Sequence, residues 1–129
     1  MKRNIVLPIA PEFVQKILCG EKKYEYRKIM CKREIKKIYF YATAPLKSNV
    51  GEAEVVEKVV MNKAELWERT KDNSGITYEH FCEYFKGKDT ASAYALGRVK
   101  KYDTPIKLEE INIFYVPQSY VYIEDLTQL

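Results

Sequence analysis

The sequence has no apolar run of about 18 residues, which is the length that a membrane-spanning helix needs. The apolar stretch after Met1-Lys2-Arg3-Asn4 ends at Pro8 and is too short for a secretory signal. Internal repeats, low-complexity tracts and linkers are also missing. At 129 residues the chain has room for one core. We therefore expect a cytoplasmic protein with one domain over residues 1–129.

Cysteine and histidine are scarce as well. The three cysteines, Cys19, Cys31 and Cys82, are odd in number and widely spaced, which indicates a reducing compartment and no disulfide framework. His80 is the single histidine, so the sequence contains no metal-ligand spacing. We expect neither a metal nor another cofactor, and we expect His80 to be a surface residue of a helix.

Basic residues are abundant in one stretch only. The chain carries a net charge of +4. Residues 21–37 hold eight basic and three acidic residues, a net charge of +5, so the rest of the chain carries −1. Besides two motif residues described below, the basic patch consists of Lys23, Lys28, Lys32, Arg33, Lys36 and Lys37. Such a patch is typical of a protein that binds a polyanion. A solvated, lysine-rich hairpin explains the charge equally well.

The hydrophobic pattern predicts about six strands and three to four helices. Expected strands span residues 4–9, 23–30, 38–42, 50–60, 91–102 and 119–123. Expected helices run from Pro11 to Gly20, over 63–71 and over 78–85 with Thr77 as N-cap, and a short turn covers 108–113. Short strands with few long crossovers favour an α+β protein built on a small mixed β-barrel.

The stretch Gly20-Glu21-Lys22-Lys23-Tyr24-Glu25-Tyr26-Arg27 has the pattern G-x-K-x-x-E-x-R. The glycine can end a helix in the left-handed conformation. Strand alternation then places Glu25 and Arg27 on one face, while Lys22 lies in the turn. At least two of these three ionisable groups should converge on a polar, mostly cationic site. Such a site suits a phosphate-bearing or base-like ligand.

This motif resembles the signature of the ASCH domain family, a branch of the PUA-like barrels. Three further stretches are similar to that family over nearly the whole chain: Tyr39-Phe40-Tyr41-Ala42-Thr43-Ala44-Pro45, Val50-Gly51-Glu52-Ala53-Glu54-Val55 and Pro117-Gln118-Ser119-Tyr120. The resemblance implies a PUA-like barrel with a cleft that is lined by the motif Lys, Glu and Arg. It also implies a role related to RNA. Some members are described as ribonucleases, and one bacterial branch deacylates N4-acetylcytidine.

In that deacylating branch a Lys and a Thr act as base and nucleophile. Lys22 matches the Lys, whereas Glu25 occupies the Thr position. A carboxylate does not simply replace a hydroxyl nucleophile, so this chain departs from the amidase pattern.

Several residue roles stay open at this point. Lys22 is a phosphate ligand, a catalytic base of lowered pKa or an exposed turn lysine. Glu25 orients Lys22, pairs with Arg27 or accepts a proton, and Arg27 grips a phosphate or only closes the ion pair. Candidate ligand contacts elsewhere are Tyr24, Tyr41 and Tyr94 by stacking, Lys47 and Ser48 at the cleft mouth, and Gln118 and Ser119 from the family motif.

Three functions compete. The first is RNA or nucleotide binding, with the motif cleft holding a nucleotide and the basic hairpin tracking phosphates. The second is a hydrolase acting on RNA or on a modified nucleoside, with Lys22 and Glu25 as its catalytic residues. The third is a regulatory module that binds duplex DNA or a protein partner. The sequence leaves the oligomeric state open.

Overall fold

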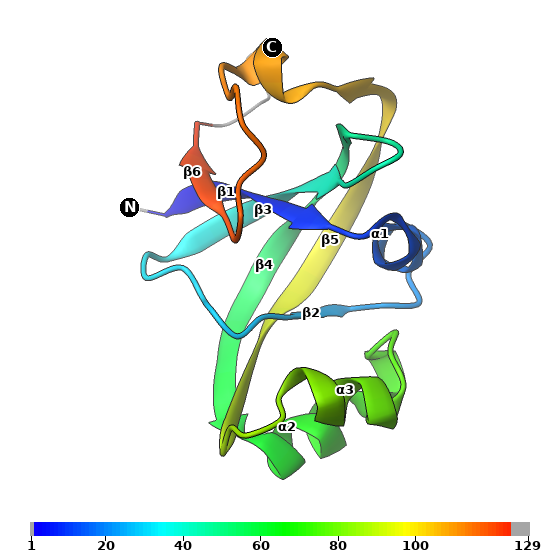
Figure 1. Cartoon of the computed structure of the whole chain (residues 1–129), viewed down its shortest axis with the longest axis vertical. Helices are drawn as coiled ribbons and strands as arrows, with labels where there is room; N and C mark the ends of the chain where they lie inside the picture. Colours follow the sequence, from blue (N-terminus) through cyan, green and yellow to red (C-terminus); the bar gives the residue numbers. More distant parts are fainter. Residues whose placement is uncertain (1, 125–129) are drawn as a thin grey trace.

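The computed structural model describes residues 2–124, which form one curved six-stranded sheet with three α-helices (Figure 1). The elements in chain order are β1 (Arg3–Ile9), α1 (Pro11–Leu18), β2 (Tyr24–Tyr26), β3 (Ile35–Ala42), β4 (Ser48–Asn62), α2 (Lys63–Thr70), η1 (Lys71–Asn73), α3 (Tyr78–Tyr84), β5 (Thr90–Ile106), η2 (Leu108–Ile111) and β6 (Val121–Ile123). No helix within residues 2–124 is long and apolar enough to cross a membrane.

The sheet has the strand order β2-β5-β4-β3-β1-β6. The β1–β3 pair is parallel and all other neighbours are antiparallel. Register shifts along the β4–β5 pair mark bulges, and bulges increase the twist of a sheet. Within the described residues β2 and β6 do not pair with each other, so the sheet is open. The α+β class is confirmed, whereas closure into a barrel is not.

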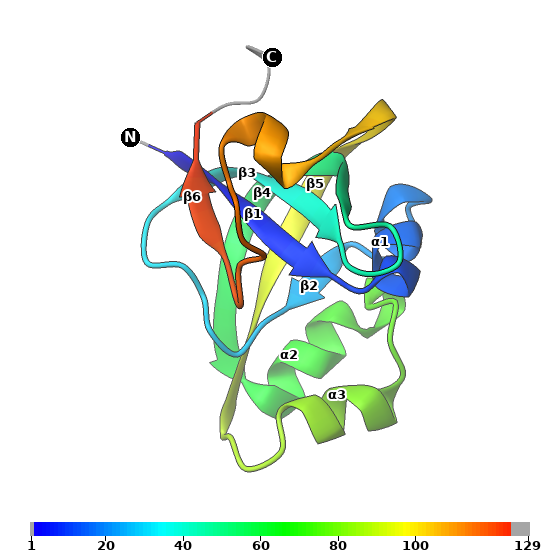
Figure 2. The same cartoon turned by 45° about the horizontal axis from the view of Figure 1, so that its top comes forward.

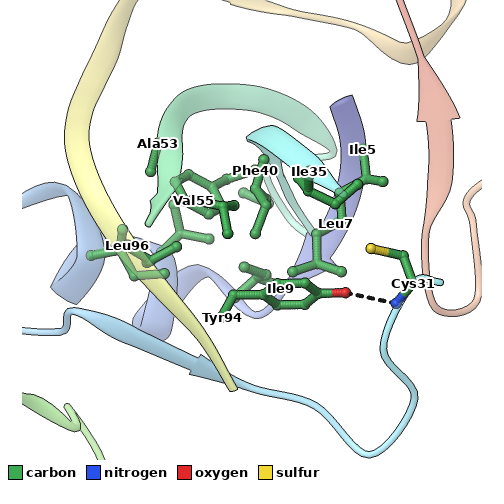
Figure 3. Close-up of a cluster of buried hydrophobic side chains, with 14 residues drawn as sticks. Ile5, Leu7, Ile9, Cys31, Ile35, Phe40, Ala53, Val55, Tyr94 and Leu96 are labelled. Carbon is green, nitrogen blue, oxygen red and sulfur yellow. Dashed lines mark hydrogen bonds between the residues drawn. The ribbon is translucent and has the colours of Figure 1, made fainter. Parts of the chain in front are cut away.

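Alternate residues of β1 and β3 pack on opposite faces of the sheet. Leu7, Ile9 and Phe40 belong to the larger core, which also holds Tyr94 and is drawn in Figure 3. Val6 and Tyr39 face the other way and pack against η2. A third cluster joins β2 to α2 and α3. These two helices lie together at one end of the molecule (Figure 1). The space between α1, α3 and β2 is where the site lies.

The predicted strand over 23–30 is much shorter in the structure, and the predicted basic hairpin is wrong. Only Tyr24–Tyr26 is extended, and β2 pairs with β5, whereas β3 pairs with β1 and β4. The cause lies in the contacts of the 27–34 connection. The Cys31 N–H donates to the Tyr94 hydroxyl at 3.0 Å (Figure 3). The Lys58 ammonium donates to the carbonyl oxygens of Cys31 and Arg33. The connection is therefore held by β5 and β4 and does not fold back on β2.

Candidate functional site

The turn after α1 directs Lys22 into the protein. Gly20 has φ +88°, which is the left-handed conformation expected after a helix end. The Lys22 N–H then donates to the Lys16 carbonyl at 3.0 Å, and the Lys23 N–H donates to the Asn73 carbonyl at 2.8 Å. These two bonds hold the turn between α1 and the loop before α3. As a result the Lys22 side chain is only 2% exposed, while Lys23 points to solvent.

The Lys22 ammonium lies in a cage of aromatic and polar groups. It donates to the Ser74 carbonyl at 2.8 Å and lies 3.8 Å from Glu25 Oε1. Its nitrogen is 4.9 Å from the ring centroid of Tyr26 and 5.7 Å from that of Phe13, distances within cation–π range. A buried ammonium needs such partners because its desolvation is costly.

Glu25 and Arg27 form the second half of this network. Arg27 Nε donates to Glu25 Oε2 at 3.0 Å, and Arg27 Nη2 donates to the Pro8 carbonyl at the end of β1. The Arg27 carbonyl in turn accepts from the Ser92 hydroxyl of β5. The guanidinium is thus fixed between β2 and β1. Glu25 lies between two cations, so the buried trio carries one net positive charge when Lys22 is protonated.

Burial lowers the pKa of Lys22 from 10.5 to about 8. Desolvation is the largest cause, Glu25 opposes it, and the nearby charges of Lys16 and Arg27 add to the lowering. A lysine with this pKa exists in both protonation states near neutral pH. It can therefore donate a charged hydrogen bond or accept a proton.

A cavity of about 230 Å³ opens beside these charged groups. It is lined by Pro8, Ile9, Ala10, Phe13, Lys22, Glu25, Tyr26, Arg27, Ile76, His80 and Tyr84. Ligand sites commonly combine apolar and aromatic walls with a few convergent polar groups, as this cavity does. Within residues 2–124 no cluster of His, Cys, Asp and Glu could hold a metal ion.

Sequence reasoning missed the aromatic wall of the cavity. His80 is solvent-exposed, as predicted, and its ring meets the half-buried ring of Phe13 edge to face at 5.5 Å. Tyr26 donates to Thr70 Oγ1 at 2.6 Å, since the Thr70 proton already goes to the Leu66 carbonyl. Burial raises the pKa of Tyr26 to about 12. No local sequence signal could have joined residues that lie 44 or more positions apart in the chain.

The other predicted ligand residues do not join this cavity. Tyr41, Lys47 and Ser48 line a separate groove of about 730 Å³. Tyr94 is fully buried in the core, so its ring offers no face to a ligand, and we leave it out of the candidate site. Tyr24 packs against the cluster under α3. Gln118 is exposed and Ser119 half-buried in the connection before β6.

Most of the predicted basic patch is solvent-exposed, namely Lys23, Lys28, Lys32, Arg33 and Lys36. Lys37 differs, because it forms an ion pair with Glu52 at 2.9 Å. Lys28 lies 4.8 Å from the ring centroid of Tyr84, which also lines the cavity. The exposed charges therefore begin at the cavity mouth and continue along the connection to β3.

Comparison with known proteins gives a matching family model and similar ASCH proteins. The family model described as a domain of unknown function, DUF365, matches residues 2–123. An ASCH domain-containing ribonuclease of Zymomonas mobilis is 29% identical over 127 residues, which cover 95% of this chain and 85% of that protein. The crystal structure of ASCH from Zymomonas mobilis is similar with a TM-score of 0.88 at 28% identity, over 98% of this chain and 92% of that chain. A point variant of that protein gives a TM-score of 0.87 at 26% identity, over 95% and 91% of the two chains. The chain belongs to the DUF365 family and is a member of the ASCH domain family.

Proposed function

We propose that this protein binds RNA and holds one nucleotide in the cavity beside Lys22, Glu25 and Arg27. The observation that carries the proposal is a buried, hydrogen-bonded cationic network that faces a cavity with aromatic walls. Aromatic rings stack on bases that have left the helix, which is how proteins commonly recognise single-stranded RNA. The ribonuclease name of the Zymomonas relative supports RNA as the ligand.

The three charged groups divide the work. Lys22 supplies a donor for a phosphate or a base oxygen. Within the described residues Glu25 Oε1 accepts no hydrogen bond, so it is available to an amino or imino group of a base. Arg27 is already committed to Glu25 and to the Pro8 carbonyl, so it orients Glu25 and adds positive potential. The exposed lysines at the mouth attract the phosphates on either side.

The test compares Lys22→Ala with Lys23→Ala in binding a fluorescent ten-nucleotide oligouridylate, followed by fluorescence anisotropy. Lys22→Ala should lose about 1–3 kcal/mol of binding free energy, as expected for a lost charged hydrogen bond. Lys23→Ala removes the same charge from an exposed neighbour, so it should only weaken the dependence of the binding constant on salt concentration. On single strands the log–log slope of this dependence is roughly −0.7 per phosphate contacted. Equal affinities of the two variants would contradict the proposal.

Cleavage of RNA is a second candidate function, favoured by the lowered pKa of Lys22. Neutral Lys22 would accept the proton of a 2′-hydroxyl group, whose oxygen attacks the adjacent phosphorus to form a 2′,3′-cyclic phosphate. The 5′-oxygen leaves and takes a proton from water. Arg27 would stabilise the added negative charge through its positive potential. The same two variants test this: Lys22→Ala should abolish cleavage of the RNA, and DNA of the same sequence should stay intact with wild type.

Hydrolysis of a modified nucleoside has weaker support. Two hydroxyls near the site are committed: Ser74, whose carbonyl accepts from Lys22, donates its hydroxyl proton to the Ile76 carbonyl, and Thr70, the partner of Tyr26, donates to the Leu66 carbonyl. Neither is free to serve as a nucleophile in this arrangement.

A further inference from the structure

A second groove lies on the opposite face of β1 and β3 from the main core. It is formed by the loop before β4, by η2 and by residues 113–116 that follow η2. The segment between η2 and β6 returns past β1 in Figure 2. Tyr41, Leu108 and Ile113 form the buried floor of this groove. The groove wall formed by residues 114–116 is exposed to solvent.

The wall of this groove exposes three apolar side chains in a row. Phe114, Tyr115 and Val116 are 78%, 61% and 53% exposed. The buried side chains of Ile113 and Pro117 flank them and fix the segment on both sides. A fixed segment that presents contiguous apolar surface is typical of an interaction site.

The charges around the exposed rings favour a nucleic acid as the occupant. Lys47 and Lys107 line the groove, and neither ammonium forms an ion pair within the described residues. Glu109 is the single carboxylate among the lining residues. Exposed rings beside unpaired cations are the arrangement by which proteins bind single strands, with bases stacked on the rings and phosphates on the cations.

The groove adjoins the cavity that holds Lys22. Pro8 lines the cavity and Tyr41 lines the groove, and these two residues are partners in the parallel β1–β3 pair. Neighbouring strands lie about 4.8 Å apart. Beyond them the Thr43 N–H still donates to the Ile9 carbonyl, so the strand ends stay together. A chain that leaves the cavity reaches the groove by crossing these two strand ends.

We propose that the groove of Phe114, Tyr115, Lys47 and Lys107 binds the single-stranded RNA that continues from the nucleotide in the Lys22 cavity, with unpaired bases stacked on the two exposed rings. This inference rests on the proposed function and extends it from one nucleotide to a track. Single-stranded RNA fits better than duplex, because the faces of paired bases are covered by their neighbours.

The test uses a variant that keeps apolar bulk but removes the rings, Phe114→Leu combined with Tyr115→Leu. Its affinity for the ten-nucleotide oligouridylate should fall at least about fivefold, because stacking contributes about 1–3 kcal/mol per base. Its affinity for uridine 5′-monophosphate should not change, because a single nucleotide occupies the cavity and does not extend into the groove. A control that keeps both rings, Phe114→Tyr with Tyr115→Phe, should bind the RNA like wild type. Thermal unfolding checks that each variant is folded.

The outcomes separate this inference from the proposed function. If the variant without rings binds RNA like wild type while Lys22→Ala is weakened, the track is wrong and the cavity remains the ligand site. The exposed rings would then belong to a protein contact. If Lys22→Ala binds like wild type while the variant without rings is weakened, the groove binds RNA and the proposed function of the cavity is wrong.

Discussion

Glu25→Ala should lower the free energy of unfolding by about 3–5 kcal/mol, because it leaves two cations without their shared partner. Lys22 is almost fully buried, and the Arg27 guanidinium is left with its bond to the Pro8 carbonyl. Chemical denaturation at pH 7 measures the effect. The loss should shrink at pH 9.5, where Lys22, with a pKa of about 8, is already neutral and no longer needs a counter-ion.

Glu57→Ala is the matched control for this experiment. Glu57 also pairs with an arginine, Arg69, at 2.8 Å, but both side chains are nearly half exposed. Such surface pairs contribute about 0–1 kcal/mol. A double variant of Glu25→Ala and Lys22→Met should recover part of the loss, because it removes one of the stranded charges. Equal costs for Glu25→Ala and Glu57→Ala would mean that burial does not set the energy of the trio.

Gly75→Ala should lower the free energy of unfolding by about 2–5 kcal/mol and weaken RNA binding as well. A Cβ atom at Gly75 would lie 2.5 Å from Lys22 Cβ and 2.6 Å from its Cγ, distances at which one of the two segments must shift. Overpacking of this kind costs about 1–3 kcal/mol. Gly75 also has φ +69°, and the left-handed conformation adds about 1–2 kcal/mol for alanine. The shift moves Lys22 away from its cage, so affinity falls together with stability.

Gly87→Ala separates the clash from the backbone cost. Gly87 has φ +82°, but no atom lies within 4 Å of the Cβ position. Gly87→Ala should therefore lower the free energy of unfolding only by the cost of the left-handed backbone conformation. Its affinity for RNA should equal that of wild type. Similar losses in stability and affinity for the two alanine variants would contradict this prediction, because they would show that the clash between a Cβ atom at Gly75 and the Lys22 side chain has no effect.

Local rules predicted the ends of the α-helices well. Pro11 begins α1, and the Thr77 hydroxyl accepts from the His80 N–H as N-cap of α3. Gly20 and Gly87 adopt positive φ where their helices end. These features depend on neighbouring residues only, so the sequence contains the information directly. The long strands β4 and β5 were also predicted, because valines recur along β4 and apolar residues fill the first half of β5.

Long-range contacts explain what the sequence did not predict. The pattern after Tyr26 reads as strand, but the chain turns away because Cys31 and Arg33 find partners on β5, β4 and β6. The motif spacing predicted that at least two of the side chains of Lys22, Glu25 and Arg27 converge, and in the structure Glu25 contacts both of the others. The wall of their cavity could not be inferred, because Ile76 and His80 reach it through long-range contacts with α1, namely the ring contact of His80 with Phe13 and the bond from Lys16 to the Gly75 carbonyl.

The pKa of Lys22 inside the RNA complex tests the central claim most directly. It can be followed by the NMR chemical shift of the side-chain carbon next to the ammonium, in the free protein and with saturating ten-nucleotide oligouridylate, with exposed Lys23 as reference. A phosphate or base oxygen at the ammonium favours its charged form, so the pKa should rise from about 8 on binding. A pKa that stays near 8 in the saturated complex would mean that RNA binds elsewhere on the protein.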